Sequence, residues 1–133
     1  LGPGSWFTSV MPHLLVPELA AALHETSARI CVTLNVFEAS HDEGRMTALE
    51  HLRALREHSP DLPVDVVVAD PSAVPDVQAM AQVAGDLGAH LMLRQVRVGD
   101  GRAVHDPLRL AAAYRDAFEG VLGDVPTGPG LAG

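Results

Sequence analysis

Residues 64–69, Val-Asp-Val-Val-Val-Ala, are the stretch that decides the fold. Pro63 precedes this run and Asp70-Pro71 follows it, so residues that end strands bound it on both sides. Four of its six residues are valine, a β-branched type enriched in strands. We therefore predict a strand here, and it is the clearest strand in the sequence.

The segments on either side alternate between helix and strand. We predict two helical pieces within residues 5–26, a strand at 29–34 buried on both faces, a helix from Thr47 to Pro60, a helix at 76–87, an extended segment at 91–98 near a sheet edge, and a last helix from Asp106. This order predicts an α/β fold, namely part of a doubly wound, Rossmann-like three-layer sandwich with a mainly parallel sheet. Because only three strands are complete, we expect the N-terminal half of such a sheet to lie upstream of Leu1.

The last helix carries apolar residues at helical spacing. They are Leu108, Ala111, Tyr114, Phe118 and Val121. We predict that this stripe packs on the sheet.

The composition excludes several classes of protein. A chain of 133 residues is long enough for one domain with a real core, and two domains are not expected. The formal net charge of -8 and the lack of clustered Lys and Arg argue against a nucleic-acid partner. No stretch approaches the ~20 apolar residues needed to span a bilayer. The single cysteine, Cys31, lies in an apolar run, which fits a cytoplasmic protein.

The run Gly2-Pro3-Gly4-Ser5 is the strongest local signal for a binding site. Its glycines let backbone amides approach an anion, and the helix behind it adds unpaired N–H groups with a partial positive charge. Thr8 and Ser9, one turn into that helix, are candidate donors to a phosphate or to the sugar beyond it. An ordinary strand-to-helix turn, with Ser5 as a plain helix cap, explains the same motif equally well. Both interpretations stay open.

Two further candidates end predicted strands. Asn35 and Asp70 do so, and ligands of open α/β sheets gather outside the carboxyl ends of the strands. Asp70 before Pro71 is also explained by a turn, and we favour the turn. Neither a Walker loop nor a dinucleotide fingerprint occurs in the sequence.

No metal site and no catalytic residue is assigned. His41-Asp42-Glu43 resembles a metal-binding run, but adjacent loop residues rarely converge on one ion, so we expect a solvated acidic loop. The other histidines show no paired metal spacing. Ser5 and Cys31 lack a nucleophile motif, and Cys31 is expected to be buried.

The N-terminal residues resemble a known family signature. The run from Leu1 to Pro17, LGPGSWFTSVMPHLLVP, closely resembles the signature G-P-G-S-x-x-T-S-x-x-P-x-L-L-V of the YvcK-type gluconeogenesis factors, which look like the deazaflavin-cofactor enzyme CofD in fold. Asn35, His51, the 64–70 strand and His105-Asp106-Pro107 fall where actinobacterial members have similar features. The resemblance implies that residues 1–122 are the C-terminal part of a CofD/YvcK-like α/β domain, followed by a disordered Gly- and Pro-rich tail at 123–133.

The resemblance also implies a function. Proteins of this type bind UDP-sugars and support gluconeogenic growth, carbon partitioning, cell shape and peptidoglycan synthesis, as regulators rather than established enzymes. It implies that a nucleotide sugar such as UDP-N-acetylglucosamine is the ligand, in a cytoplasmic homo-oligomer such as a dimer. The residues to which it assigns binding are Gly2, Pro3, Gly4, Ser5, Thr8, Ser9 and Asn35.

Two alternatives remain. A CofD-type phospholactate transferase of deazaflavin cofactor biosynthesis has a similar fold, although that branch usually carries a P-S-N-P type loop in place of residues 2–5. In the other alternative, this part of the protein supplies sheet packing and a dimer surface, and ligand specificity is set upstream. One departure from the family is Ser40-His41-Asp42-Glu43, which stands where a P-G-E-T element is common, so backbone contacts of that element are not carried over.

Overall fold

Three parallel strands form the sheet, in the order β1-β2-β3. They are Cys31–Thr33, Val66–Ala69 and His90–Leu93, and Val66 pairs with Cys31 on one side and with His90 on the other. The computed structural model describes residues 1–36 and 46–119. Every residue of β1 and β2 is buried, as expected for parallel strands covered on both faces. The three predicted strands are confirmed, each shorter than its apolar run.

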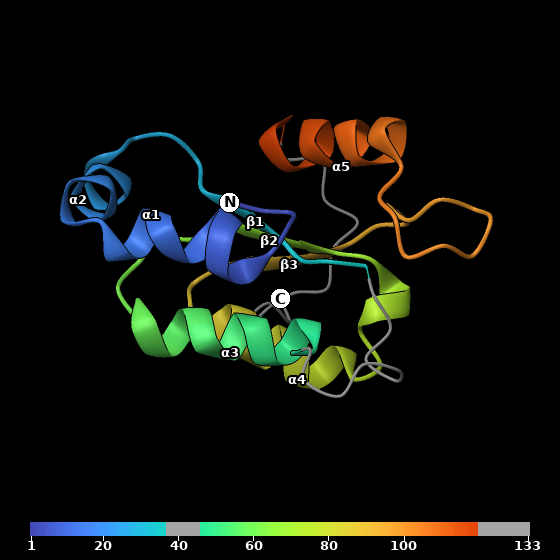
Figure 1. The fold of residues 1–133 in the computed structure, drawn as a ribbon, viewed down its shortest axis with the longest axis horizontal. Coiled ribbons are helices and arrows are strands. Elements are labelled where there is room, and N and C mark those ends of the chain that lie inside the picture. The colour runs from blue at the N-terminus through green and yellow to red at the C-terminus, as the bar shows by residue number, and fades with distance from the viewer. Residues whose placement is uncertain (37–45, 120–133) are drawn as a thin grey trace, which may run out of the picture.

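Helices cover both faces of the sheet and make a three-layer sandwich (Figure 1). In chain order they are η1 (Trp6–Val10), α1 (Met11–Leu15), α2 (Pro17–Glu25), α3 (Ala48–His58), η2 (Pro71–Ala73), α4 (Val77–Asp86) and α5 (Pro107–Glu119). η1, α1, α3 and α4 pack on the face to which Val67 points, whereas α5 packs on the face to which Val68 points. The predicted α/β fold, part of a Rossmann-like sandwich, is confirmed.

Local capping explains where the main helices begin. Thr47 Oγ1 accepts a hydrogen bond from Glu50 N at 3.1 Å, and Glu50 Oε2 accepts one from Thr47 N at 2.6 Å, which completes the predicted capping box of α3. Asp76 and Asp106 accept backbone N–H bonds in the first turns of α4 and α5. The starts of these helices were therefore predictable from the sequence.

The third strand ends earlier than the sequence predicts. Residues 91–98 were expected to be extended throughout, but β3 ends at Leu93, and Arg97 makes only an isolated antiparallel bridge with His105. The buried carboxylate of Asp70 accepts hydrogen bonds from the amides of Val96 and Arg97, so these amides do not continue the ladder with β2. Among the described residues, β3 lies at one end of the β1-β2-β3 order, as expected for a strand near a sheet edge.

The predicted apolar stripe of the last helix is wrong for Leu108, Ala111 and Phe118, which are exposed. Leu108 is 83% exposed and Phe118 is 53% exposed, while Ala113 and Ala117 are the buried residues of α5. Small side chains let a helix lie close to a sheet, so Ala113 and Ala117 make the closest contact, while Leu108 and Phe118 turn outward. Tyr114 of the predicted stripe is half-buried and does pack against the sheet face. Val121 lies outside the described residues.

Some expectations fall on parts of the chain that the structure does not describe. These are the acidic run His41-Asp42-Glu43, the Ser40–Glu43 departure from the family and the tail at 123–133. Within the described residues, no helix has the length and apolarity that crossing a bilayer requires.

Candidate functional site

The N-terminal loop is attached to β1 by backbone hydrogen bonds. The amino group of Leu1 donates to Cys31 O at 2.7 Å, and Thr33 N donates to Leu1 O at 2.9 Å, which is the pattern of two residues paired in parallel. Gly2 follows with a φ of 74°, and a Cβ at this position would lie 2.5 Å from Thr33 O. Only glycine therefore fits where the loop leaves the sheet edge.

Asn35 holds the next part of the loop. Its Oδ1 accepts a hydrogen bond from Gly4 N at 2.9 Å, and its Nδ2 donates one to Gly4 O at 2.7 Å. Asn35 is buried, with 8% of its surface exposed. The two predicted site residues are therefore brought together, and the Gly4 amide is occupied by a side chain of the protein itself.

The helical segment behind the loop begins without a side-chain cap. Ser5 makes no capping hydrogen bond through its side chain, although Ser5 O accepts from Thr8 N at 3.2 Å and from Ser9 N at 2.7 Å. Ser5 is therefore the N-cap residue by position, but it lacks the side-chain hydrogen bond of a helix cap. Among the described residues, none accepts a hydrogen bond from the amides of Ser5, Trp6 and Phe7. Three N–H groups are thus left at the start of the continuous helical segment Trp6–Leu15.

The two predicted hydroxyl donors, Thr8 and Ser9, differ in their exposure. Thr8 is exposed, whereas Ser9 is half-buried with its Oγ only 2.7 Å from where a Cβ of Gly4 would be. Gly4 has a φ of 144°, so both its backbone conformation and its neighbour favour glycine. Ser9 packs against the loop, and Thr8 is the hydroxyl that faces solvent.

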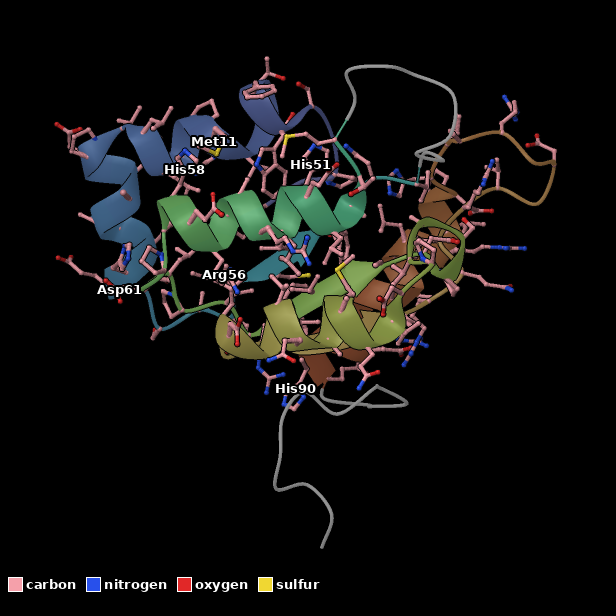
Figure 2. All side chains as sticks on the ribbon, turned by 90° about the horizontal axis from the view of Figure 1, so that it is seen from below. Met11, His51, Arg56, His58, Asp61 and His90 are labelled. Carbon is pink, nitrogen blue, oxygen red and sulfur yellow. The ribbon has the colours of Figure 1, made fainter. Side chains whose placement is uncertain are left out.

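Trp6, the first residue of this segment, stacks on His51 of α3. Their rings stack with centroids 4.9 Å apart and planes inclined by 20°, and Trp6 is buried. Figure 2 shows His51 on the side of α3 that faces the first helical segment. Burial lowers the pKa of His51, and the nearby Glu50 charge only partly offsets this. No role was predicted for Trp6, although its spacing of four residues from Val10, which is also buried, was the available signal.

Asp70 has a structural role at the same edge of the sheet. Its Oδ1 accepts from Ser72 N at 2.9 Å and from Ser72 Oγ at 2.7 Å, while Oδ2 accepts from Val96 N at 2.8 Å and Arg97 N at 2.9 Å. Burial acts to raise the pKa of Asp70, but these four hydrogen bonds prevail and lower it. The favoured turn interpretation agrees with these contacts.

The remaining titratable candidates in the described part of the chain do not converge on a reactive centre. Burial raises the pKa of the Cys31 thiol, which favours the unreactive form. The described residues hold no group of three His, Cys, Asp or Glu side chains suited to a metal ion. His105 places its Nε2 3.3 Å from Leu34 O and so connects the start of α5 to the end of β1.

A three-layer α/β sandwich with a glycine loop leading from the sheet into a helix defines the Rossmann-like class of domain. The sequence profile of the family described as "2-phospho-L-lactate transferase CofD" matches residues 1–99. The chain therefore belongs to the CofD-like family, and its relatives place it with the YvcK-type members.

Curated relatives share the name "Putative gluconeogenesis factor". The protein from Mycobacterium tuberculosis is 40% identical over 116 residues, which cover 84% of this chain and 33% of the relative. The one from Mycobacterium leprae is 38% identical over 117 residues, covering 85% and 32%. The one from Deinococcus radiodurans is 32% identical over 130 residues, covering 90% and 28%. The chain thus spans about a third of the length of the curated relatives it matches, and no solved structure matches it significantly.

Proposed function

We propose that this chain is the part of a UDP-sugar-binding regulator of gluconeogenic growth that holds the ligand's diphosphate. The observation that carries the proposal is the set of amides of Ser5, Trp6 and Phe7, which lack an acceptor among the described residues, whereas the Gly4 amide is paired with Asn35. Negative charge is favoured at such a helix start.

Unpaired first-turn amides occur at every helix start. The location of these three amides in the fold therefore has to distinguish this helix start as a binding site. They follow a loop with two glycines at positive φ, Gly2 and Gly4, next to the carboxyl end of β1. Ligands of open α/β sheets bind outside the carboxyl ends of the strands. The exposed hydroxyl of Thr8, one turn further on, is the side-chain donor best placed for the sugar.

Calorimetry of the full-length protein with UDP-N-acetylglucosamine tests the proposal. We expect saturable binding, and no saturable heat at millimolar ligand would contradict it. Replacing Ser5, whose side chain is exposed and forms no cap, by tryptophan places a bulky group over the three amides. We expect this variant to lose at least tenfold in affinity, and unaltered affinity would favour a purely scaffolding role for this part of the protein.

The proposed regulatory role also includes a physiological output and an oligomeric state, which a binding measurement does not test. We propose that the bound UDP-sugar reports on carbon partitioning, cell shape and peptidoglycan synthesis, and that the protein acts as a homo-oligomer such as a dimer. Light scattering of the full-length protein with and without UDP-N-acetylglucosamine measures the oligomer directly. A monomer under both conditions would contradict it.

A CofD-type transferase is the second candidate, because the matching family is described as a 2-phospho-L-lactate transferase. In that case the same amides would hold phosphate of the donor. Mass spectrometry of the full-length protein with a validated donor and the deazaflavin precursor decides between the candidates. Phospholactyl product identifies the transferase, and its absence together with UDP-sugar binding supports the regulator.

A further inference from the structure

The carboxamide of Asn35 is engaged twice by one residue. Oδ1 accepts from the Gly4 N–H and Nδ2 donates to the Gly4 carbonyl, at 2.9 and 2.7 Å. Both polar groups of a single residue's backbone are therefore held by one side chain that is 31 positions away in sequence. Two such contacts fix the orientation of the loop as well as its position.

The loop needs this support because of the conformation of Gly4. Its φ of 144° lies in the range that glycine adopts readily, so the loop has conformational freedom to lose. On its other side, Ser9 Oγ approaches to 2.7 Å from the Cβ position of Gly4. Gly4 is thus held between Asn35 and Ser9, and the direction of the following amides depends on it.

We propose that Asn35 is a positioning residue of the diphosphate site and not a contact of the ligand. This inference rests on the proposed function, and it changes the role that the family resemblance implies for Asn35. The side chain is 8% exposed and points its oxygen and nitrogen at Gly4, so it sets the direction of the Ser5, Trp6 and Phe7 amides before a ligand arrives.

The contrast between ligands that share a diphosphate tests this role. In the full-length protein, Asn35→Ala is compared with the unaltered protein for UDP-N-acetylglucosamine, UDP and inorganic pyrophosphate. A positioning residue acts on the amides alone, so all three affinities should fall by the same factor, about tenfold for two lost hydrogen bonds. A loss restricted to the UDP-sugar, or no loss at all, would overturn the proposal.

A double-mutant cycle with Gly4→Ala gives an independent check. The added Cβ meets Ser9 Oγ, so this change disturbs the same loop by another route. If Asn35 acts through Gly4, the double variant should bind no worse than the weaker single variant. Additive losses would mean that Asn35 touches the ligand itself, and the proposal would be wrong.

Asp65→Ala is the matched control. Asp65 Oδ2 accepts a hydrogen bond from Ile30 N at 2.7 Å, which is a comparable long-range contact at the opposite end of β1. Its loss should lower stability without changing any of the three affinities.

Hydrogen exchange separates the inference from the proposed function. Asn35→Ala should speed exchange of the Gly4 amide at least tenfold, and Asp65→Ala should not. If the unaltered protein binds none of the three ligands, the proposed function fails, while this exchange result still decides whether Asn35 positions the loop. Unchanged exchange at Gly4 would overturn the positioning role.

Discussion

Asp70 joins two segments of the carboxyl edge through one buried carboxylate. It holds Ser72 at the start of η2 and the amides of Val96 and Arg97 after β3. Asp70→Asn puts an amide N–H against donors, so we expect the free energy of unfolding to fall by about 2–4 kcal/mol. Urea denaturation measures the loss. Asp100→Asn, on an exposed carboxylate that bonds only Arg102 in the described structure, should change it by less than about 0.5 kcal/mol.

The same contacts of Asp70 predict that the stability of the fold depends on pH. The pKa of Asp70 is lower in the folded protein than its ordinary value of about 3.9, so folding favours the ionised form. This contribution is fully present above pH ~4 and is lost as the pH falls through the lowered pKa. Acid titration of stability should therefore be shallower for Asp70→Asn than for the unaltered protein below pH ~4. Parallel curves would show that other carboxylates control the acid transition.

The buried His51 predicts that the stability of the fold also depends on pH nearer neutrality. Burial lowers its pKa, so the folded state favours the neutral ring that stacks on Trp6. The unfolded value is about 6.5, so stability should be complete above that pH and should decrease as the pH falls towards the lowered pKa. Trp6 is the only tryptophan of the chain, so its fluorescence reports on this stack.

His51→Phe removes the titrating group and keeps an aromatic ring against Trp6. The decrease in stability below about pH 6.5 should then disappear. His24→Phe, on an exposed ring, is the control and should leave the decrease in place. If both variants behave like the unaltered protein, His51 does not control this transition.

In α5, close packing against the sheet determines which face of the helix is buried. Ala113 and Ala117 are buried against the sheet, while Ala111 on the same helix is exposed. Ala117→Leu forces extra volume into this contact, so we expect a loss of about 1–3 kcal/mol in the free energy of unfolding. Ala111→Leu makes the same chemical change in solvent and should stay within about 0.5 kcal/mol. Equal effects of the two changes would contradict the assigned orientation of α5.

Residues close together in the sequence predicted where the helices and strands lie. Contacts between residues far apart in the sequence determine which helix face is buried and which site residues pair. Thr47 with Glu50, and Asp106 with Pro107, lie within a few residues of each other, so their capping roles could be predicted. The buried face of α5 depends on the sheet beneath it, which helical spacing alone does not define. The pairing of Asn35 with Gly4 joins residues 31 positions apart. The sequence therefore indicated both residues as site candidates, but not that one holds the other.

At the scale of the whole molecule, a groove runs along the outer edge of β1 in the part of the chain that the structure describes. It has a volume of about 570 Å³ and is lined mostly by apolar side chains of α2, β1 and α5, with Leu1 and Gly2 at its edge. Figure 1 shows α2 and α5 standing apart, with the N-terminus between them. No residue of α2 is buried, although Leu19 and Leu23 form an apolar stripe on it. A helix with an uncovered apolar stripe gains little stability from the part of the chain that the structure describes.

The curated relatives are about three times as long as the matched part of this chain, so we expect the rest of the full-length protein to pack into this groove. Leu19→Glu and Phe118→Glu place a charge on its two walls. In the full-length protein each should lower the free energy of unfolding by about 1–3 kcal/mol, because the carboxylate would be buried without a partner. Leu108→Glu is the control, since Leu108 is on α5, 83% exposed, and does not line the groove. Chemical denaturation compares the three variants. If the groove variants are as stable as Leu108→Glu, the groove faces solvent in the full-length protein and α2 is an exposed helix.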